Sequence, residues 1–164
     1  MIAIINKLIN KISIILMVMM FLMPIITSIL ILTRSIFGIG SISAQELVMY
    51  FHATIFMLGI AYTLKHNRHV SIDIFYNSFS TKTKERIIKL GYLIFIIPFG
   101  VFLIYISSGM VFESWRLLEG SSEAGGLGYV FILKSLIPLC GVLIVLQSFV
   151  ILIKEFKGKV EDDC

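Results

Sequence analysis

Four long stretches of the chain carry no charged side chain, and their lengths set the expected architecture. They cover residues 12–33, 47–64, 90–112 and 135–153, and the last is apolar back toward Leu127. A helix needs roughly 20 apolar residues to cross about 30 Å of hydrocarbon. The stretches lack the two-residue alternation of strands, and four segments cannot close a barrel. The pattern predicts an all-α integral membrane protein, a single membrane domain over residues 1–164 with spans at about 12–33, 47–64, 90–112 and 130–153.

The composition agrees with lipid as the solvent for most of the chain. Apolar residues make up 58% and charged residues 15%, against about 45–50% and about 25% in a soluble domain. The mean hydropathy is +0.98. A soluble domain of this size cannot bury so large a share of apolar residues. Intrinsically disordered chains have far fewer apolar residues, so this composition also excludes disorder. No disulfide is expected, because Cys140 lies inside the fourth span and Cys164 ends the chain.

Lysine and arginine are concentrated in alternate connections, which predicts the topology. The N-terminal tail carries two, the middle connection six and the C-terminal tail three, against one and two in the other connections. Positive residues favour the cytoplasmic side of a membrane, so both termini and the middle connection are expected in the cytoplasm of a multi-pass bacterial inner membrane protein. Nucleic-acid binding is not expected, because the basic residues flank helices and lack interleaved aromatic side chains.

The three connections differ in character. The first carries four apolar residues, which suit either a short segment lying in the interface or an ordinary loop: Ile36, Phe37, Ile39 and Ile42. The second, residues 65–89, is basic and partly amphipathic, as expected of a cytoplasmic surface near anionic lipid headgroups. The third combines Trp115, placed where aromatic belts form, with glycines that allow a sharp re-entry. This third connection is the best candidate for a docking surface.

His69 and Asp73 are the strongest candidates for chemistry. They lie four residues apart and share one face of a helix. The pair permits a membrane-embedded enzyme, or a metal site if His66 joins it. A membrane acyltransferase places one more residue between its His and Asp, and no partner motif follows here. We therefore expect a structural or interface role for the pair, with no metal and no cofactor.

The spans themselves contain little that can move a charged solute. The first three hold no Asp, Glu, Lys or Arg, and His52 is a single histidine without a second ligand for haem. Lys134 lies near the outer end of the fourth span, where its ammonium can snorkel, pair with Glu119 or Glu123, or contact another subunit. Gln147 lies deeper, and its amide is expected to seek a partner across a helix interface.

In two blocks the chain resembles the small membrane subunit, of the DctQ type, of tripartite ATP-independent periplasmic (TRAP) transporters. The first block is Glu46, then Tyr62-Thr63-Leu64-Lys65 and the pattern His69-x-x-x-Asp73. The second is Ser114-Trp115, Glu119-Gly120-Ser121, Gly125-Gly126-Leu127, Lys134, Ile137-Pro138 and Gln147. The family often has a pair of acids at the start of the second helix, whereas Gln45 precedes Glu46 here. The resemblance covers nearly the whole chain.

The resemblance implies a small permease subunit rather than an enzyme. Its partners would be a large membrane subunit that carries the solute and sodium sites, and a periplasmic binding protein that delivers a carboxylate or dicarboxylate. The small subunit would act as a scaffold, with partner contacts at Glu46, His69, Asp73, Trp115, Glu119, Ser121, Lys134 and Gln147. Two alternatives remain open on the residues: an enzyme using His69 and Asp73, and a free-standing small membrane protein that oligomerises.

Overall fold

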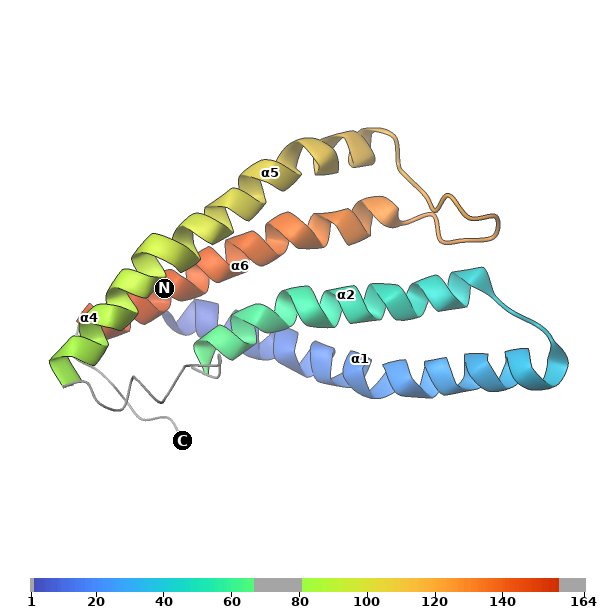
Figure 1. The fold of residues 1–164 in the computed structure, drawn as a ribbon, viewed down its shortest axis with the longest axis horizontal. Helices are drawn as coiled ribbons and strands as arrows, with labels where there is room; N and C mark the ends of the chain where they lie inside the picture. Colours follow the sequence, from blue (N-terminus) through green and yellow to red (C-terminus); the bar gives the residue numbers. More distant parts are fainter. Residues whose placement is uncertain (1, 67–80, 157–164) are drawn as a thin grey trace.

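The computed structural model describes residues 2–66 and 81–156 (Figure 1). Its elements are α1 (Ile2–Phe37), α2 (Ile42–Lys65), α4 (Thr81–Gly91), the π-helical turn η1 (Tyr92–Ile96), α5 (Ile97–Arg116) and α6 (Val130–Phe156). Within the described ranges there is no strand, and four segments are long and apolar enough to cross a membrane: Ile4–Phe37, Ile42–Lys65, Arg86–Arg116 and Val130–Lys154. This confirms the expected fold class, and each expected span lies inside one of these segments.

The first connection is shorter than the sequence suggested. α1 continues to Phe37 and is followed by Gly38, whose left-handed backbone (φ 65°) is typical of a helix end. α2 begins at Ile42 behind Ser41, whose hydroxyl caps the first turn. Only residues 38–41 separate the two helices. Ile36 and Phe37 therefore belong to α1 and Ile42 belongs to α2, and only Ile39 of the four apolar residues lies in the connection.

One face of α1 follows a seven-residue repeat. Its buried and partly buried apolar positions alternate in steps of four and three residues: Ile5, Ile9, Ile12, Leu16, Met19, Met23, Ile26 and Leu30. Such a repeat lets a helix pack along one neighbour as a left-handed pair, and the main neighbour of α1 is α2. The opposite side of α1 is open, with Phe21 72% and Ile31 63% exposed.

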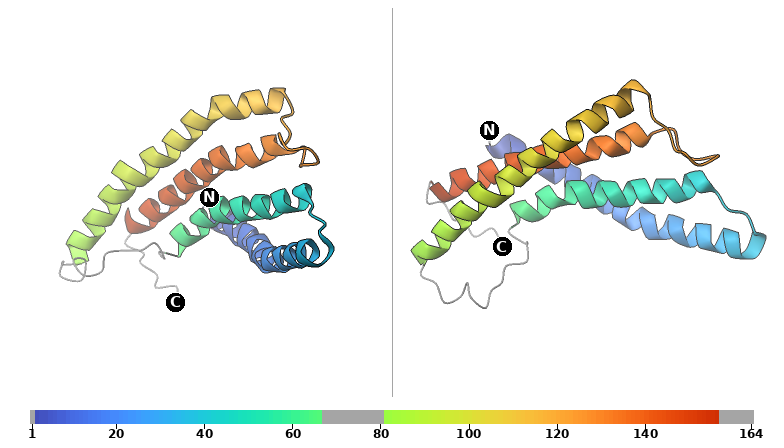
Figure 2. Two further views of the ribbon diagram at one scale, coloured as in Figure 1. Left: turned by 45° about the vertical axis from the view of Figure 1, so that its right-hand side comes forward. Right: turned by 45° about the horizontal axis from the view of Figure 1, so that its top comes forward.

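The helices form a row in which α6 is central. α6 lies between α5 and α2, and α2 lies between α6 and α1 (Figures 1 and 2). One buried cluster joins Cys140 and Ile144 of α6 to Leu64 of α2. A second joins Ile9, Ala61 and Leu143, one residue from each of α1, α2 and α6. Both clusters therefore depend on α6.

α5 and α6 approach each other closely at two glycines. A Cβ atom built on Gly141 would lie 2.7 Å from the Gly100 carbonyl oxygen, and one built on Gly100 would lie 3.1 Å from the Gly141 carbonyl oxygen. Small residues allow helix backbones to approach closely in a membrane, where apolar burial supplies no driving force. The two glycines therefore fix how α5 and α6 cross.

A π-helical turn precedes the proline of the third spanning segment. The Ile97 N–H bonds to the Tyr92 carbonyl, five residues back, and Pro98 follows with no N–H to donate. Such turns are usual places for a helix axis to bend. α4, η1 and α5 nevertheless run as one long helix beside α6 (Figure 1).

Candidate functional site

Four parts of the chain meet at one end of the molecule: the start of α2, the end of α5, the connection 117–129 and the first turns of α6 (Figure 1). Polar and aromatic side chains from these parts form a group that we name the polar cluster: Glu46, Trp115, Glu119, Ser121, Lys134 and Ser135. Its hydrogen bonds join segments that are up to 81 residues apart in the sequence. The cluster therefore determines how the connection sits on the helices.

Glu46 ties the connection to α2. Its carboxylate accepts one hydrogen bond from the Ser121 hydroxyl and another, of 2.6 Å, from the Leu127 backbone N–H. Gly126 lies directly beside this contact, because a Cβ there would collide with the Ser121 side chain and come within 2.7 Å of Glu46 Oε1. The missing side chain at Gly126 is what allows the carboxylate to reach the loop.

The connection also closes on itself. The Ser121 N–H donates to the Leu127 carbonyl at 2.9 Å, and the Gly126 N–H donates to the Glu123 carbonyl at 3.0 Å. The Ser121 hydroxyl accepts a hydrogen bond from the Glu123 N–H at 3.1 Å. Gly125 supplies the positive φ, 83°, that this turn requires. Residues 121–127 are therefore a compact turn of defined shape.

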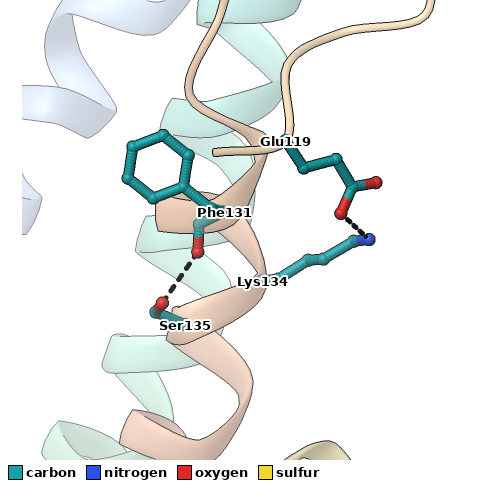
Figure 3. A network of polar contacts seen from close by, with 4 residues as sticks. All are labelled: Glu119, Phe131, Lys134 and Ser135. Atoms are coloured by element: carbon teal, nitrogen blue, oxygen red, sulfur yellow. Dashed lines mark hydrogen bonds and ion pairs between the residues drawn. The ribbon is translucent and has the colours of Figure 1, made fainter. Parts of the chain in front are cut away.

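Lys134 pairs with Glu119 and joins the connection to α6 (Figure 3). The ammonium lies 2.5 Å from Glu119 Oε2, and the two side chains are 27% and 37% exposed. The hydrogen bond from Lys134 holds the pKa of the Glu119 carboxyl below its ordinary value. Of the two acids considered from the sequence, Glu119 is the partner in the structure.

Trp115 joins the end of α5 to α6. Its indole N–H donates to the Ser135 hydroxyl at 2.7 Å, and its ring meets Phe131 edge-on with centroids 4.7 Å apart. The Ser135 hydroxyl in turn donates to the Phe131 carbonyl (Figure 3). Half of the Trp115 surface stays exposed. The side chain therefore joins the two helices and also remains accessible at this end of the molecule.

The family model for "Tripartite ATP-independent periplasmic transporters, DctQ component" matches residues 23–158. The chain belongs to the DctQ family. The match takes in all of α2, α4, α5 and α6 and the part of α1 from residue 23 onward. A search of curated proteins finds no match. This DctQ chain is therefore a membrane-embedded transporter component, and its family is not one of enzymes, as the resemblance implied.

The structure brings together most of the expected site residues of the DctQ chain. Five of them lie in the polar cluster: Glu46, Trp115, Glu119, Ser121 and Lys134. Gln147 lies apart on α6 and is 1% exposed. His69 and Asp73 lie outside the described residues, so neither the interface role nor the enzyme alternative built on them is tested.

Three contributors to the cluster were not expected from the sequence. Ser135 follows Lys134 of the second block, and Gly126 and Leu127 stand in that block, but no contact was assigned to any of the three. Leu127 contributes only its backbone N–H, a group that every residue except proline carries, so its side chain does not indicate this contact. The sequence therefore indicated most of the side chains of the polar cluster but not the hydrogen bonds that connect them.

The chemistry of the cluster is structural. Both carboxylates, Glu46 and Glu119, are engaged by hydrogen-bond donors from elsewhere in the chain. Among the residues that the structure describes, no group of three or more His, Cys, Asp or Glu side chains could hold a metal ion. The arrangement is suited to holding the connection 117–129 in one conformation against α2 and α6.

Proposed function

We propose that this DctQ chain is the small permease subunit of a TRAP-type secondary transporter. It acts as a scaffold that supports the large membrane subunit during sodium-coupled uptake of carboxylate-type solutes, and a periplasmic binding protein delivers those solutes. The observation that carries the proposal is the family match over residues 23–158. Further support comes from the lack of charged residues in the middle of the spans and from the contacts between the helices.

The uncharged stretches that form the middle of the four spans offer no charged group for solute or ion coupling. Residues 12–33, 47–64, 90–112 and 135–153 contain no Asp, Glu, Lys or Arg. Ion-coupled carriers generally place such residues or broken helices near the middle of the membrane. The solute and sodium sites then belong to the large subunit, and this chain supplies a fixed support for its movement.

The interhelical contacts suit a rigid support. Gly100 and Gly141 allow α5 and α6 to meet backbone to backbone, and Trp115 joins the same two helices at their ends. Glu46 adds α2 to this unit through the connection 117–129. Because three of the four spanning segments are linked at the polar cluster, they resist movement relative to one another.

We also propose a topology in which the polar cluster faces the periplasm. The start of α1, α4 and the end of α6 lie toward one end of the molecule (Figure 1). Lys7, Lys11, Arg86, Lys89 and Lys154 belong to these segments, and positive residues favour the cytoplasmic side. The polar cluster lies at the opposite end, where the connection 117–129 would face the binding protein.

The surface of this connection has the character of a docking site. Leu117 and Leu118 are 69% and 66% exposed, and Trp115 is half exposed beside them. Leu118 also has a positive φ of 46°, which a leucine rarely adopts. Exposed apolar and aromatic side chains that lie together are typical of interaction surfaces, so we propose the binding protein as the partner here.

Co-purification tests the proposal. Cells carry the large subunit with an affinity tag, the binding protein and this chain, and the chain is expected to elute with the tagged subunit at a one-to-one ratio. Deleting this chain is expected to abolish carboxylate uptake while the large subunit remains in the membrane. Undiminished uptake in the deletion strain would contradict the proposal.

A further inference from the structure

His52 occupies an unusual position for a polar residue in this chain. It lies on α2 ten residues after Ile42 and thirteen before Lys65, which is near the middle of the spanning segment. Its ring is exposed and stacks on Phe56, with centroids 6.4 Å apart. The described residues give His52 this ring contact and no hydrogen bond.

Six serine and threonine side chains in the spans behave differently. They donate to a carbonyl one turn back on their own helix, at distances from 2.6 to 2.8 Å: Thr27, Ser28, Thr54, Ser107, Ser135 and Ser148. Such residues need no outside partner in hydrocarbon. A neutral imidazole carries one donor and one acceptor nitrogen, and His52 has satisfied neither within the chain.

An exposed imidazole at this depth is not suited to contact with lipid tails. Acyl chains offer no hydrogen bond, and an unpartnered polar group in hydrocarbon is costly. Polar side chains inside membrane spans generally face other helices. A His52 side chain that faced lipid tails would therefore carry this cost.

Two hollows lie along the same side. One, of about 650 Å³, lies between α1 and the second half of α2 and is lined in part by Met20, Phe56, Gly59 and Thr63. The other, of about 270 Å³, lies at the far ends of the same helices and is lined in part by Arg34, Gln45 and Val48. The surface of the α1–α2 pair is thus hollowed at two places along the length of the helices.

Helical periodicity places His52 between the two hollows. On α2 the steps from Gln45 through Val48, His52, Phe56 and Gly59 to Thr63 are all three or four residues, so these residues share one face. A Cβ built on Gly59 would meet nothing within 4 Å. Packing inside this chain therefore does not require a glycine there, whereas a helix from outside would approach most closely at that position.

We propose that the α1–α2 face, defined by Gln45, Val48, His52, Phe56, Gly59 and Thr63 with the adjoining side of α1, is where the large membrane subunit packs. A helix of that subunit lies along the groove and provides a hydrogen-bonding group to His52. This inference rests on the proposed function and adds to it the side of the chain that the partner occupies. The rival is the outer side of α5, with Phe102 and Tyr105 55% and 78% exposed, which neither hollow borders.

Site-specific photo-crosslinking separates the two sides. Phe56 and Phe102 are 63% and 55% exposed, and each is replaced in turn by the photoreactive residue p-benzoylphenylalanine, which keeps a phenyl ring at the site. The complex is isolated through a tag on the large subunit and then irradiated. The expected result is an adduct with the large subunit that is several times stronger from position 56 than from position 102.

The other outcomes overturn the inference in distinguishable ways. A stronger adduct from position 102, an adduct from position 56 with a second copy of this chain, or lipid adducts only from position 56 would each reject the α1–α2 face and leave the proposed function standing. Absence of this chain from the isolated complex would reject both.

A pair of substitutions at His52 tests the hydrogen bond itself. His52→Leu removes both hydrogen-bonding nitrogens, and His52→Gln keeps a donor and an acceptor. Recovery of the chain with the large subunit is expected to fall about threefold for the leucine variant, the usual size of one interhelical hydrogen bond in a membrane, and to stay near the wild-type level for the glutamine variant. Equal recovery of both variants would contradict the role of the imidazole.

Discussion

Glu46 and Leu127 are joined by a hydrogen bond of 2.6 Å although 81 residues separate them in the sequence. The donor is a backbone N–H and the acceptor is the carboxylate at the start of α2. The same carboxylate accepts a hydrogen bond from the Ser121 hydroxyl, so one side chain holds both ends of the turn 121–127. This relationship makes Glu46 the residue on which the conformation of the connection most depends.

Replacing Glu46 by Gln is expected to loosen the connection. A glutamine keeps the size of the side chain but has one acceptor oxygen and an amide group that cannot accept from Ser121 or Leu127. Limited proteolysis of the purified protein in detergent is expected to cleave within 117–129 several times faster. Glu123→Gln is the matched control, because Glu123 is an exposed acid in the same connection. Equal cleavage of the two variants would show that Glu46 does not hold the loop.

Replacing Gly126 by Ala is expected to disrupt the same contact from the other side. The added Cβ would collide with Ser121 and lie 2.7 Å from Glu46 Oε1. Overpacking of this kind typically costs about 1–3 kcal/mol of stability, to be measured as a lower thermal unfolding temperature. Gly128→Ala is the control, since a Cβ there meets nothing within 4 Å. A Gly126→Ala protein as stable as the control would contradict the geometry.

The pair formed by Glu119 and Lys134 is expected to make stability depend on pH. Because Lys134 lowers the pKa of Glu119 in the folded protein, the pair stabilises the fold above the ordinary glutamate pKa of about 4.3. That stabilisation is lost as the pH falls through the lowered pKa of the folded state. Lys134→Met should therefore unfold at a lower temperature than wild type at neutral pH, and the gap should close in acid.

An exposed ion pair in the same region provides the control for this experiment. Glu113 and Arg116 lie 3.5 Å apart with side chains 54% and 66% exposed, and exposed pairs contribute little to stability. Arg116→Met is expected to unfold close to the wild-type temperature at both pH values. If the wild-type and Lys134→Met temperatures differ equally at neutral and acid pH, the pairing with Glu119 is not the cause.

Replacing Gly141 by Ala is expected to push α5 away from α6. The new Cβ would lie 2.7 Å from the Gly100 carbonyl oxygen and 2.9 Å from the Ile104 side chain. We expect a loss of about 1–3 kcal/mol in stability, read from thermal unfolding. Gly109→Ala, on α5, adds a Cβ into open space and should leave stability unchanged or improve it, because alanine favours a helix. Equal stability of both variants would argue against the glycine contact.

The four spans were predictable because one physical effect dominates them. Charged side chains are costly in hydrocarbon, so the uncharged stretches mark the membrane. The helix ends were less predictable: α1 continues past Arg34 to Phe37, although Arg34 ends the uncharged stretch. An arginine in the last turn suits a helix C-terminus and can reach the interface, so the helix need not end where the charge begins.

The contacts within the polar cluster could be predicted only in part. The sequence identified Lys134 as needing a partner and offered Glu119 or Glu123, but the choice depends on how the connection 117–129 folds against α6. Glu46 and Leu127 both stand in the blocks that resemble the family, but nothing in either side chain marks the two residues as hydrogen-bond partners. Chain folding over 81 residues decides that contact, and local sequence does not encode it.

Solute uptake by purified components decides whether this chain is a scaffold or a carrier. Proteoliposomes are prepared with this chain alone, with the large subunit alone, and with both, and each preparation receives the binding protein, an inward sodium gradient and a labelled carboxylate that the binding protein is known to bind. Uptake is predicted only when both membrane subunits are present. Sodium-driven accumulation by vesicles that contain this chain alone would contradict the account.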